Sequence, residues 1–305
     1  MAPPAEGRRP QLGLLAVAVF FISTSAPIIA ATTAPALAIA FWRTALGALF
    51  TSGWTLTRHW PELRSIRGRQ LWLCVAGGVL LAAHFAFWIP SLRYTSVASS
   101  TALVSTQPVW AALMARARGV HVARGVWVGI GIAAVGVVVL TGVDVSLDSR
   151  SLLGDAMALV GAMLAAAYVS VGEQARQRTS TPTYTLLAYA SSALVLLPVC
   201  LLAGAALTGY PTRDWWLILA LTLLAQLLGH SLINATLRTT SATVTSMGIL
   251  FEMPIATVIA ALWLGQWPPV AVLPALALLL VGVAVVIRAG GGAGSTSATL
   301  AESPT

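Results

Sequence analysis

The sequence contains no lysine and little charge of either sign. Charged residues make up 9% of its 305 residues, and Asp and Glu together number 9. A water-soluble domain of this size carries roughly a quarter charged residues, because water must solvate its surface. The mean hydropathy of +0.86 and the hydrophobic share of 58% instead indicate that lipid surrounds most of the chain. The scarcity of charge therefore argues against a soluble fold and favours an all-α integral membrane protein.

Cysteine and cofactor motifs are equally scarce. Cys74 and Cys200 lie inside apolar runs without the spacing of a metal or redox site, so we expect both to be packed. No G-x-x-x-x-G-K-[S/T] loop is present, which argues against ATP-driven transport by this chain. No His/Cys/Asp/Glu cluster has metal-ligand spacing. We expect no cofactor, no metal and, because the arginines lie at helix ends, no nucleic-acid partner.

Ten apolar segments are long enough to cross a bilayer, which takes about 20 residues each. They are expected at 11–31, 35–56, 70–91, 96–115, 124–142, 153–173, 183–206, 214–236, 240–265 and 269–288. The first resembles a signal peptide, with 34–38 as a loose cleavage site, but its apolar run is long and we favour an uncleaved helix. Residues 1–10 and the Gly/Ser-rich residues 289–305 are expected to be tails, the second one disordered.

Arginine is the only strongly basic residue, and its distribution orients the segments. If the N-terminus is cytoplasmic, 13 of the 17 arginines fall on the inner side and three, Arg93, Arg150 and Arg213, fall outside. Arg43 lies within a segment. Positive residues concentrate on the cytoplasmic side of membrane proteins. The bias therefore predicts a multi-pass protein of the plasma or inner membrane with both termini in the cytoplasm.

The chain repeats itself with an offset of 145 to 146 residues. The sequence from Leu92 to Ser96, followed by Gln107-Pro108, is echoed by Leu237 to Ser241, followed by Glu252-Met253-Pro254. Each copy contains five segments, an odd number, so the second inserts upside down relative to the first. We expect two inverted five-helix repeats, 11–142 and 153–288, an arrangement typical of transporters with a midplane substrate site.

Several of these motifs resemble one known family. They are Ser91–Ala98, Phe251–Pro254, Gly154-Asp155, Ala166-Ala167-Tyr168 and Phe41-Trp42-Arg43. Together they resemble the ten-helix EamA branch of the drug/metabolite transporter superfamily over residues 11–288. The resemblance implies a central cavity lined mostly by helices 1–4 and 6–9. It also implies efflux or facilitated passage of small metabolites such as amino acids. Many members carry Gly-Glu after helices four and nine, where this chain has Arg116-Ala117-Arg118 and Gly265-Gln266.

Two charged residues lie deep within expected helices. A charge at mid-bilayer costs roughly 2.5–3.5 kcal/mol on insertion scales, so such residues usually face protein or water. Glu252 could bind a substrate amine or carry a proton, and it could equally be a permanent partner of Arg43. Arg43 could hold a substrate carboxylate, be a fixed ion-pair partner, or reach the outer headgroups.

The segment 214–236 carries a polar stripe on one face. Its members are four residues apart, a spacing that places side chains on one side of a helix: Thr222, Gln226, His230 and Asn234. His84, at offset 146, corresponds to His230. The stripe could line a cavity or form hydrogen bonds between helices, and either histidine could carry a proton.

Further candidates are helix breakers, aromatics and small residues. Pro27, Pro108 and Pro254 could act as gates or as static kinks. Trp88 is the aromatic that we assign to the substrate site, and Trp42, Trp110 and Tyr168 could also shape the cavity. Glu173 and Arg176 are expected to pair. Small residues on 124–142 (Gly129, Gly131, Ala133, Ala134 and Gly136) predict tight helix contact, compatible with a homodimer seam.

These features favour a membrane transporter that works by alternating access, with a small-molecule substrate, lipid as solvent and proton coupling as an option. An intramembrane enzyme is the rival class, yet no nucleophile–base pair is identifiable from spacing. A nucleotide-sugar or phosphate exchanger would call for several cavity cations, and Arg43 alone is evident. We therefore expect a transporter rather than an enzyme.

Overall fold

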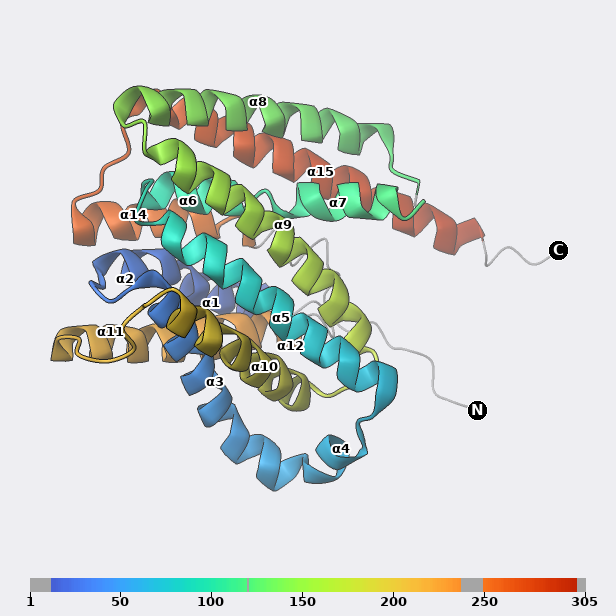
Figure 1. Ribbon diagram of the computed structural model, residues 1–305. Helices are drawn as coiled ribbons and strands as arrows, with labels where there is room; N and C mark the ends of the chain where they lie inside the picture. The colour runs from blue at the N-terminus through green and yellow to red at the C-terminus, as the bar shows by residue number, and fades with distance from the viewer. Residues whose placement is uncertain (1–11, 120, 237–248, 301–305) are drawn as a thin grey trace.

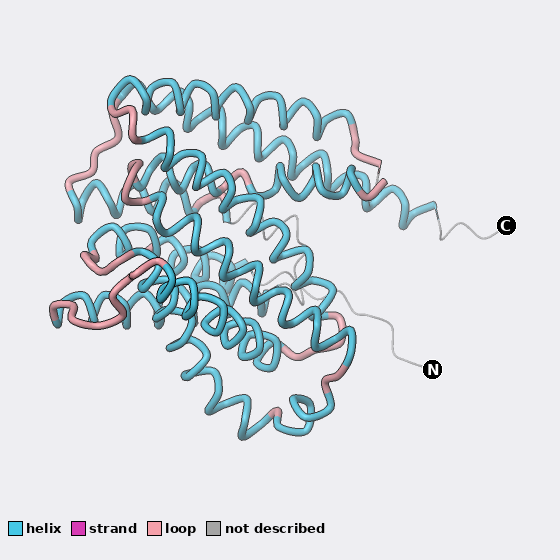
Figure 2. The backbone as a smooth tube through the Cα atoms, viewed as in Figure 1, coloured by secondary structure: helices cyan, strands magenta, loops and turns pink. Residues whose placement is uncertain are grey.

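The computed structural model describes residues 12–119, 121–236 and 249–300, and every regular element in these ranges is a helix (Figures 1 and 2). Side chains of a few helical residues, Asn234 among them, lie outside this description. The elements are α1 (Leu12–Ser23), α2 (Ser25–Ala31), α3 (Ala36–Arg58), α4 (Trp60–Ser65), α5 (Gly68–Ser91), α6 (Val97–Val104), α7 (Gln107–Ala117), α8 (Arg124–Leu147), α9 (Ser151–Arg176), α10 (Thr181–Leu202), α11 (Thr212–Leu221), η1 (Thr222–His230), α12 (Ser231–Thr236), α14 (Glu252–Leu264), η2 (Val270–Val272) and α15 (Leu273–Leu300).

Within the described ranges, eight segments are long and apolar enough to cross a membrane. The expected span 96–115 is present as two shorter helices, α6 and α7. The described part of the expected span 240–265 contains α14, a shorter apolar helix. The prediction of an all-α membrane protein is confirmed. The predicted boundaries agree with the structure to within a few residues, except that the last helix ends at Leu300 and the predicted start at 240 lies outside the described residues.

Three helix interruptions coincide with the three prolines identified from the sequence. α1 ends one residue before Thr24, α6 and α7 are separated by Ser105 and Thr106, and α14 begins after a turn at residues 250–251. Each proline lies in the first turn of the helix that follows. Because proline has no N–H, it cannot bond to the carbonyl four residues earlier.

Hydroxyl groups at two of these interruptions satisfy backbone carbonyls. Ser23 Oγ donates to the Val19 carbonyl at 2.6 Å, Ser105 Oγ to that of Thr101 at 2.8 Å, and Thr106 Oγ1 to that of Leu103 at 2.6 Å. Irregular backbone is tolerated at membrane depth when neighbouring groups satisfy it in this way.

The helix contacts are symmetric under exchange of the two halves. α8 packs on α15 and α3 on α10, each pairing an element with its own counterpart. Further contacts come in matched pairs: α5–α9 with α1–η1, α5–α10 with α3–η1, and α7–α9 with α1–α14. The two five-helix repeats expected from the motif offset therefore pack about a pseudo-two-fold axis, and an odd number of helices in each makes them inverted.

The α8–α15 pair lies at one edge of the molecule, where the two helices run side by side (Figure 1). Glycines set their close approach: a Cβ built on Gly129 would lie 2.6 Å from the Val286 nitrogen, and one on Gly282 2.4 Å from the Ala133 nitrogen. Gly131, by contrast, faces open space. The small residues predicted on this segment thus contact α15 through Gly129 and Ala133.

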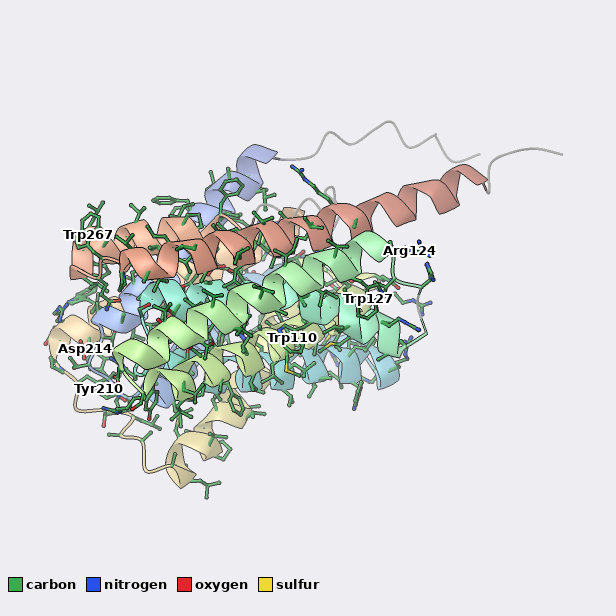
Figure 3. The ribbon with its side chains drawn as sticks, turned by 90° about the horizontal axis from the view of Figure 1, so that it is seen from above. Trp110, Arg124, Trp127, Tyr210, Asp214 and Trp267 are labelled. Carbon is green, nitrogen blue, oxygen red and sulfur yellow. The ribbon has the colours of Figure 1, made fainter. Side chains whose placement is uncertain are left out.

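Arginines gather at one end of the helices. The connections α3–α4–α5, α7–α8 and α9–α10 and the last turns of α15 carry ten of the described arginines, whereas Arg93, Arg150 and Arg213 lie at the other end. Figure 3 shows Arg124 at the arginine-rich end and Tyr210, Asp214 and Trp267 at the opposite end. The fold therefore places most of the described arginines at one end of the helices, as the arginine bias in the sequence predicted.

Two expectations need correction. Residues 290–300 continue α15 as a helix, although their composition predicted a disordered tail. Extending an existing helix adds one backbone hydrogen bond per residue without a new nucleation step, which offsets the poor helix propensity of glycine. The segment 214–236 is also not one regular α-helix, because Thr222–His230 has π-helical geometry, a distortion that is frequent at functional sites.

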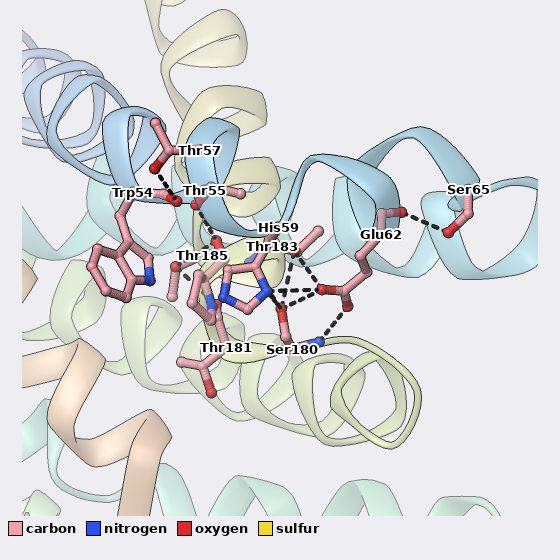
Figure 4. Close-up of polar contacts among 11 residues, drawn as sticks. Trp54, Thr55, Thr57, His59, Glu62, Ser65, Ser180, Thr181, Thr183 and Thr185 are labelled. Atoms are coloured by element: carbon pink, nitrogen blue, oxygen red, sulfur yellow. Dashed lines mark hydrogen bonds and ion pairs between the residues drawn. The ribbon is translucent and has the colours of Figure 1, made fainter.

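Polar contacts join the two halves at the arginine-rich end, between α4 and the start of α10 (Figure 4). The Glu62 carboxylate accepts from the Ser180 N–H at 2.6 Å, from the Ser180 hydroxyl, and from Thr183 Oγ1 at 2.8 Å. His59 Nδ1 lies 3.4 Å from it. Partial burial disfavours the charged carboxylate, but the hydrogen bonds and His59 outweigh this and hold the pKa of Glu62 below its ordinary value.

The opposite end is joined as well. The Asp214 carboxylate accepts from the backbone N–H of Thr33 at 3.0 Å and from the Thr33 hydroxyl. The Arg93 guanidinium donates to the carbonyls of Thr32 and Ala34 at 2.6 and 2.9 Å. The connection between α2 and α3 is thereby held from two sides.

We predict that Gly282→Ala destabilises the protein and that Gly131→Ala does not. The added methyl group at Gly282 would overlap the α8 backbone, and overpacking of this kind costs about 1–3 kcal/mol. At Gly131 the methyl group contacts no other atom, and the better helix propensity of alanine should raise the free energy of unfolding by at most about 1 kcal/mol. Thermal unfolding midpoints in detergent measure both; equal midpoints would show that α8 and α15 do not pack closely.

We also predict an acid-sensitive contribution from Glu62. Because its pKa is lower in the folded protein, the contribution is fully present above the unfolded value of about 4.5 and is lost as the pH falls through the folded value. The midpoint of wild type should therefore drop more steeply on acidification than that of Glu62→Gln. Parallel curves for the two proteins would contradict the assignment.

Candidate functional site

A cavity of about 130 Å³ lies between the two halves of the molecule. Both repeats contribute to its walls, through α2, α5 and α7 on one side and α9, α10, η1 and α14 on the other. Its polar lining consists of Ser25, His84, Trp88, Ser105, Gln107, Tyr168, Glu173, Tyr184, His230 and Glu252. A cavity of about this size holds a molecule of roughly benzene dimensions.

His84 and Trp88, one turn apart on α5, form a stacked pair on the cavity wall. Their rings are 5.6 Å apart and inclined by 7°. His84 Nδ1 lies 2.9 Å from the Gly161 carbonyl on α9, so this nitrogen carries the proton and Nε2 is left as an acceptor when the ring is neutral. A Cβ on Gly161 would lie 3.1 Å from Trp88 Cβ. The glycine thus lets α5 and α9 approach closely enough to fix both rings.

His230, the repeat counterpart of His84, is the last residue of the π-helical turn and lines the same cavity. Its ring meets Phe85 edge-on at 6.4 Å. The two histidines, which correspond at the repeat offset, therefore line the cavity from opposite halves. The remaining members of the polar stripe behave differently: Thr222 bonds to its own helix at the Ile218 carbonyl, and Gln226 bonds to Arg43.

Glu252 opens α14 and lines the cavity with 8% of its surface exposed. A carboxylate is favoured at a helix N-terminus, where unpaired N–H groups create a positive field. Among the described residues no hydrogen bond or ion pair engages its oxygens. Its carboxylate is therefore left to interact with what the cavity contains.

Arg43 is completely buried and belongs to a different network. Its Nε and Nη2 donate to Gln226 Oε1 at 3.0 and 2.7 Å, and Nη1 donates to Ser25 Oγ at 3.3 Å. The guanidinium also lies 4.1 Å above the Phe85 ring centroid, a cation–π geometry. Arg43 neither forms an ion pair with Glu252 within the described residues nor reaches the headgroup region.

The sequence candidates therefore fall into three groups. His84, Trp88, His230, Glu252 and Pro108 line the cavity. Arg43 and Gln226 lie behind its wall, with Ser25 linking them to it, while Pro27 and Pro254 lie beside lining residues of α2 and α14. The Asn234 side chain lies outside the described residues.

Tyr184 was not among the sequence candidates, and Glu173 was expected only to pair with Arg176. Tyr184 inserts between two glycines, and a Cβ on Gly77 or Gly172 would lie 2.8 or 2.7 Å from its hydroxyl oxygen. Glu173 lines the cavity, and Arg176 Nη2 donates to Thr181 Oγ1 at 3.0 Å. Glycines facing each other on α5 and α9 were the available signal for a large inserted side chain.

The described part of the chain contains no group of three or more His, Cys, Asp or Glu side chains placed to hold a metal ion. The cavity instead offers hydrogen-bond donors and acceptors. Trp88 Nε1 is buried without a partner in the described structure. Such groups are normally satisfied, which indicates that a bound molecule or water completes the site.

Comparison with known proteins agrees with this geometry. The model of the EamA-like transporter family matches residues 10–142 and again residues 152–288. A curated protein of Archaeoglobus fulgidus, described as an uncharacterized transporter, is 26% identical over 172 residues, which is 54% of this chain. The match spans 57% of that protein, little more than half its length.

A solved crystal structure of a protein has the same fold. It superposes with a TM-score of 0.64 over 93% of this chain and 99% of its own length, at 16% sequence identity. At this identity the likeness concerns the fold alone.

We predict that Gln226→Leu strongly destabilises the protein. The change removes the acceptor of two Arg43 donors and leaves a buried charge unpaired, which costs about 1–3 kcal/mol for a neutral group and more for a charged one. Thr222→Val, one turn away, is the control because its hydroxyl bonds within its own helix. Similar unfolding midpoints for the two variants would show that Gln226 does not hold Arg43.

Proposed function

Because the chain belongs to the EamA-like transporter family, we propose that it carries a small metabolite across the membrane by alternating access around the cavity described above. The observation that carries this proposal is the position of the cavity on the seam between two inverted repeats, with walls from both. Rocking of one repeat against the other would expose such a cavity to each side in turn.

The helix interruptions support a gating role for the prolines. Pro108 lines the cavity, and Pro27 and Pro254 lie in the first turns of α2 and α14 beside it. An interruption concentrates bending at a few backbone angles, so a half-helix can tilt without disturbing the packed remainder. We propose that α2, α7 and α14 pivot at these points.

The chemistry of the wall favours an amino acid or a related small compound. The Glu252 carboxylate suits a substrate amine, and the buried donor Trp88 Nε1 suits a carboxylate or carbonyl oxygen. Arg43, which lies behind the wall, is engaged by Gln226 and Ser25, and none of the described residues that line the cavity is an arginine. A phosphate-bearing cargo would find no free cation on the described wall.

We further propose that the protein resides in the plasma or inner membrane and acts as an exporter or facilitator. The arginine-rich end would then be cytoplasmic, as would both termini.

Proteoliposomes loaded with a ¹⁴C-labelled mixture of the protein amino acids test the proposal. Wild type should release a subset of them faster than empty liposomes. Glu252→Gln should slow this release about 10–100-fold, since a hydrogen bond to a charged group is worth about 1.5–3 kcal/mol. Efflux is followed by scintillation counting and the released compounds by mass spectrometry.

Asp148→Asn provides the matched control, because it makes the same chemical change at an exposed carboxylate outside the cavity. It should transport as wild type does. Equal efflux from wild type and Glu252→Gln would remove the substrate role of Glu252. Conversion of a labelled compound inside the vesicles without efflux would indicate an intramembrane enzyme instead.

A further inference from the structure

We propose that Asp144 and Asp155 share a single proton at the joint between the two repeats, forming a proton-binding site separate from the central cavity. Asp144 is in the last turn of α8, the final helix of the first repeat. Asp155 is in the first turns of α9, the initial helix of the second repeat. The short connection 148–150 is all that separates the two helices along the chain.

Both carboxylates are buried, with 6% of Asp144 and 1% of Asp155 exposed. The start of α9 is pressed against the α5–α6 connection, because a Cβ on Gly154 would lie 2.8 Å from the Thr95 nitrogen and 3.0 Å from the Ser91 carbonyl oxygen. Asp144 lies within hydrogen-bonding range of Asp155. The two acids therefore meet in a confined space closed by protein.

No cation neutralises this pair within the described residues. Arg93 donates to the carbonyls of Thr32 and Ala34, and the Arg150 guanidinium lies 5.6 Å from the Tyr94 ring centroid. Neither forms an ion pair with Asp144 or Asp155 in the part of the chain described. Asp148, in the connection itself, is exposed and accepts from the Arg150 N–H.

The other neighbours are neutral. Thr95 Oγ1 donates to Asp144 Oδ2 at 3.5 Å, and the hydroxyls of Ser99 and Thr141 lie close by. From η2 and α15, the residues that pack beside the end of α8 are the apolar Val272, Leu276 and Leu279. The hydroxyls of Thr95 and Thr141 also lie near the Asp155 carboxyl.

A single shared proton removes the repulsion between the two buried carboxylates. Two like charges close together in a buried site repel each other and lose their hydration, whereas a carboxyl donating to a carboxylate removes one charge and satisfies one oxygen of Asp155. The pair then titrates as a unit rather than as two separate groups. A resident metal ion is less suited, since no third acid, His or Cys joins the pair among the described residues.

The site would couple protonation to the packing of the two repeats. With the proton bound, α8 and α9 are joined by a hydrogen bond. Without it, two negative charges face each other at the joint and favour separation of the helix ends. This inference does not depend on which metabolite the central cavity takes, because neither acid lines that cavity.

Infrared spectroscopy of the protein in lipid nanodiscs at neutral pH tests the inference. Wild type should show the carbonyl band of a protonated carboxylic acid, and Asp144→Asn and Asp155→Asn should each lose one carboxyl equivalent of that band. Asp148→Asn should keep it. The spectra are compared in a Glu252→Gln background, so that the cavity carboxylate contributes nothing to the difference.

A band unchanged in both variants would overturn the proposal. Should either variant fail to fold, the pH dependence of the thermal unfolding midpoint of the Glu252→Gln protein tests the proposal instead. A folded state that binds one extra proton loses stability as the pH rises from about 5 to about 9, so a midpoint that does not fall overturns it. A midpoint at neutral pH that rises with sodium but not with choline would show a metal-cation site and would also overturn it. Loss of amino-acid efflux, by contrast, would bear only on the transport proposal.

Discussion

Hydrocarbon offers no hydrogen-bond partner, so every polar group within the membrane must find its partner inside the protein. The burial of Arg43 shows how this constraint shapes the molecule. Its guanidinium is engaged by Gln226 of η1, Ser25 of α2 and the face of Phe85 of α5. One charge thereby fixes the relative positions of four helices next to the cavity. A water-soluble protein could leave the same residue to solvent; here the packing of α3 must be arranged around it.

The same constraint explains where irregular backbone occurs. The described helices are interrupted at Thr24, at Ser105–Thr106 and before Glu252, and all three places adjoin the cavity. Serine and threonine hydroxyls donate hydrogen bonds to backbone carbonyls near the first two interruptions. The lipid-facing pair α8 and α15 has no such interruption and packs through glycines instead. Broken helices thus lie where water or a ligand can reach them, whereas this peripheral pair remains regular.

Much of the fold followed from the sequence because its signals are local. Apolar runs about the thickness of a bilayer located the helices, prolines marked the interruptions, and the motif offset separated the repeats. The contacts of the site were harder to predict, because partners are set by rotation and depth of helices far apart in sequence. The sequence suggested Glu252 as the partner of Arg43, yet Arg43 donates to Gln226, 183 positions away. Tyr184 joined the cavity only because Gly77 and Gly172 leave room for its ring. The π-helical turn had no recognisable sequence signal, and it places His230 on the cavity wall.

The scaffold is symmetric, but its chemistry is not. At the offset of 146 residues, His84 and His230 are equivalent and both line the cavity. Arg43 corresponds to Tyr189, whose hydroxyl donates to the Gln226 carbonyl, and Glu252 corresponds to Thr106, which satisfies its own helix. Duplication therefore produced two repeats with similar helix packing. Sequence divergence then placed the buried cation on one repeat and the cavity carboxylate on the other. An asymmetric molecule with a positive and a negative end can be oriented in such a cavity, whereas a fully symmetric pair of sites would bind it equally well in two directions. The difference between the repeats, rather than their likeness, is what can give the site a preferred substrate pose.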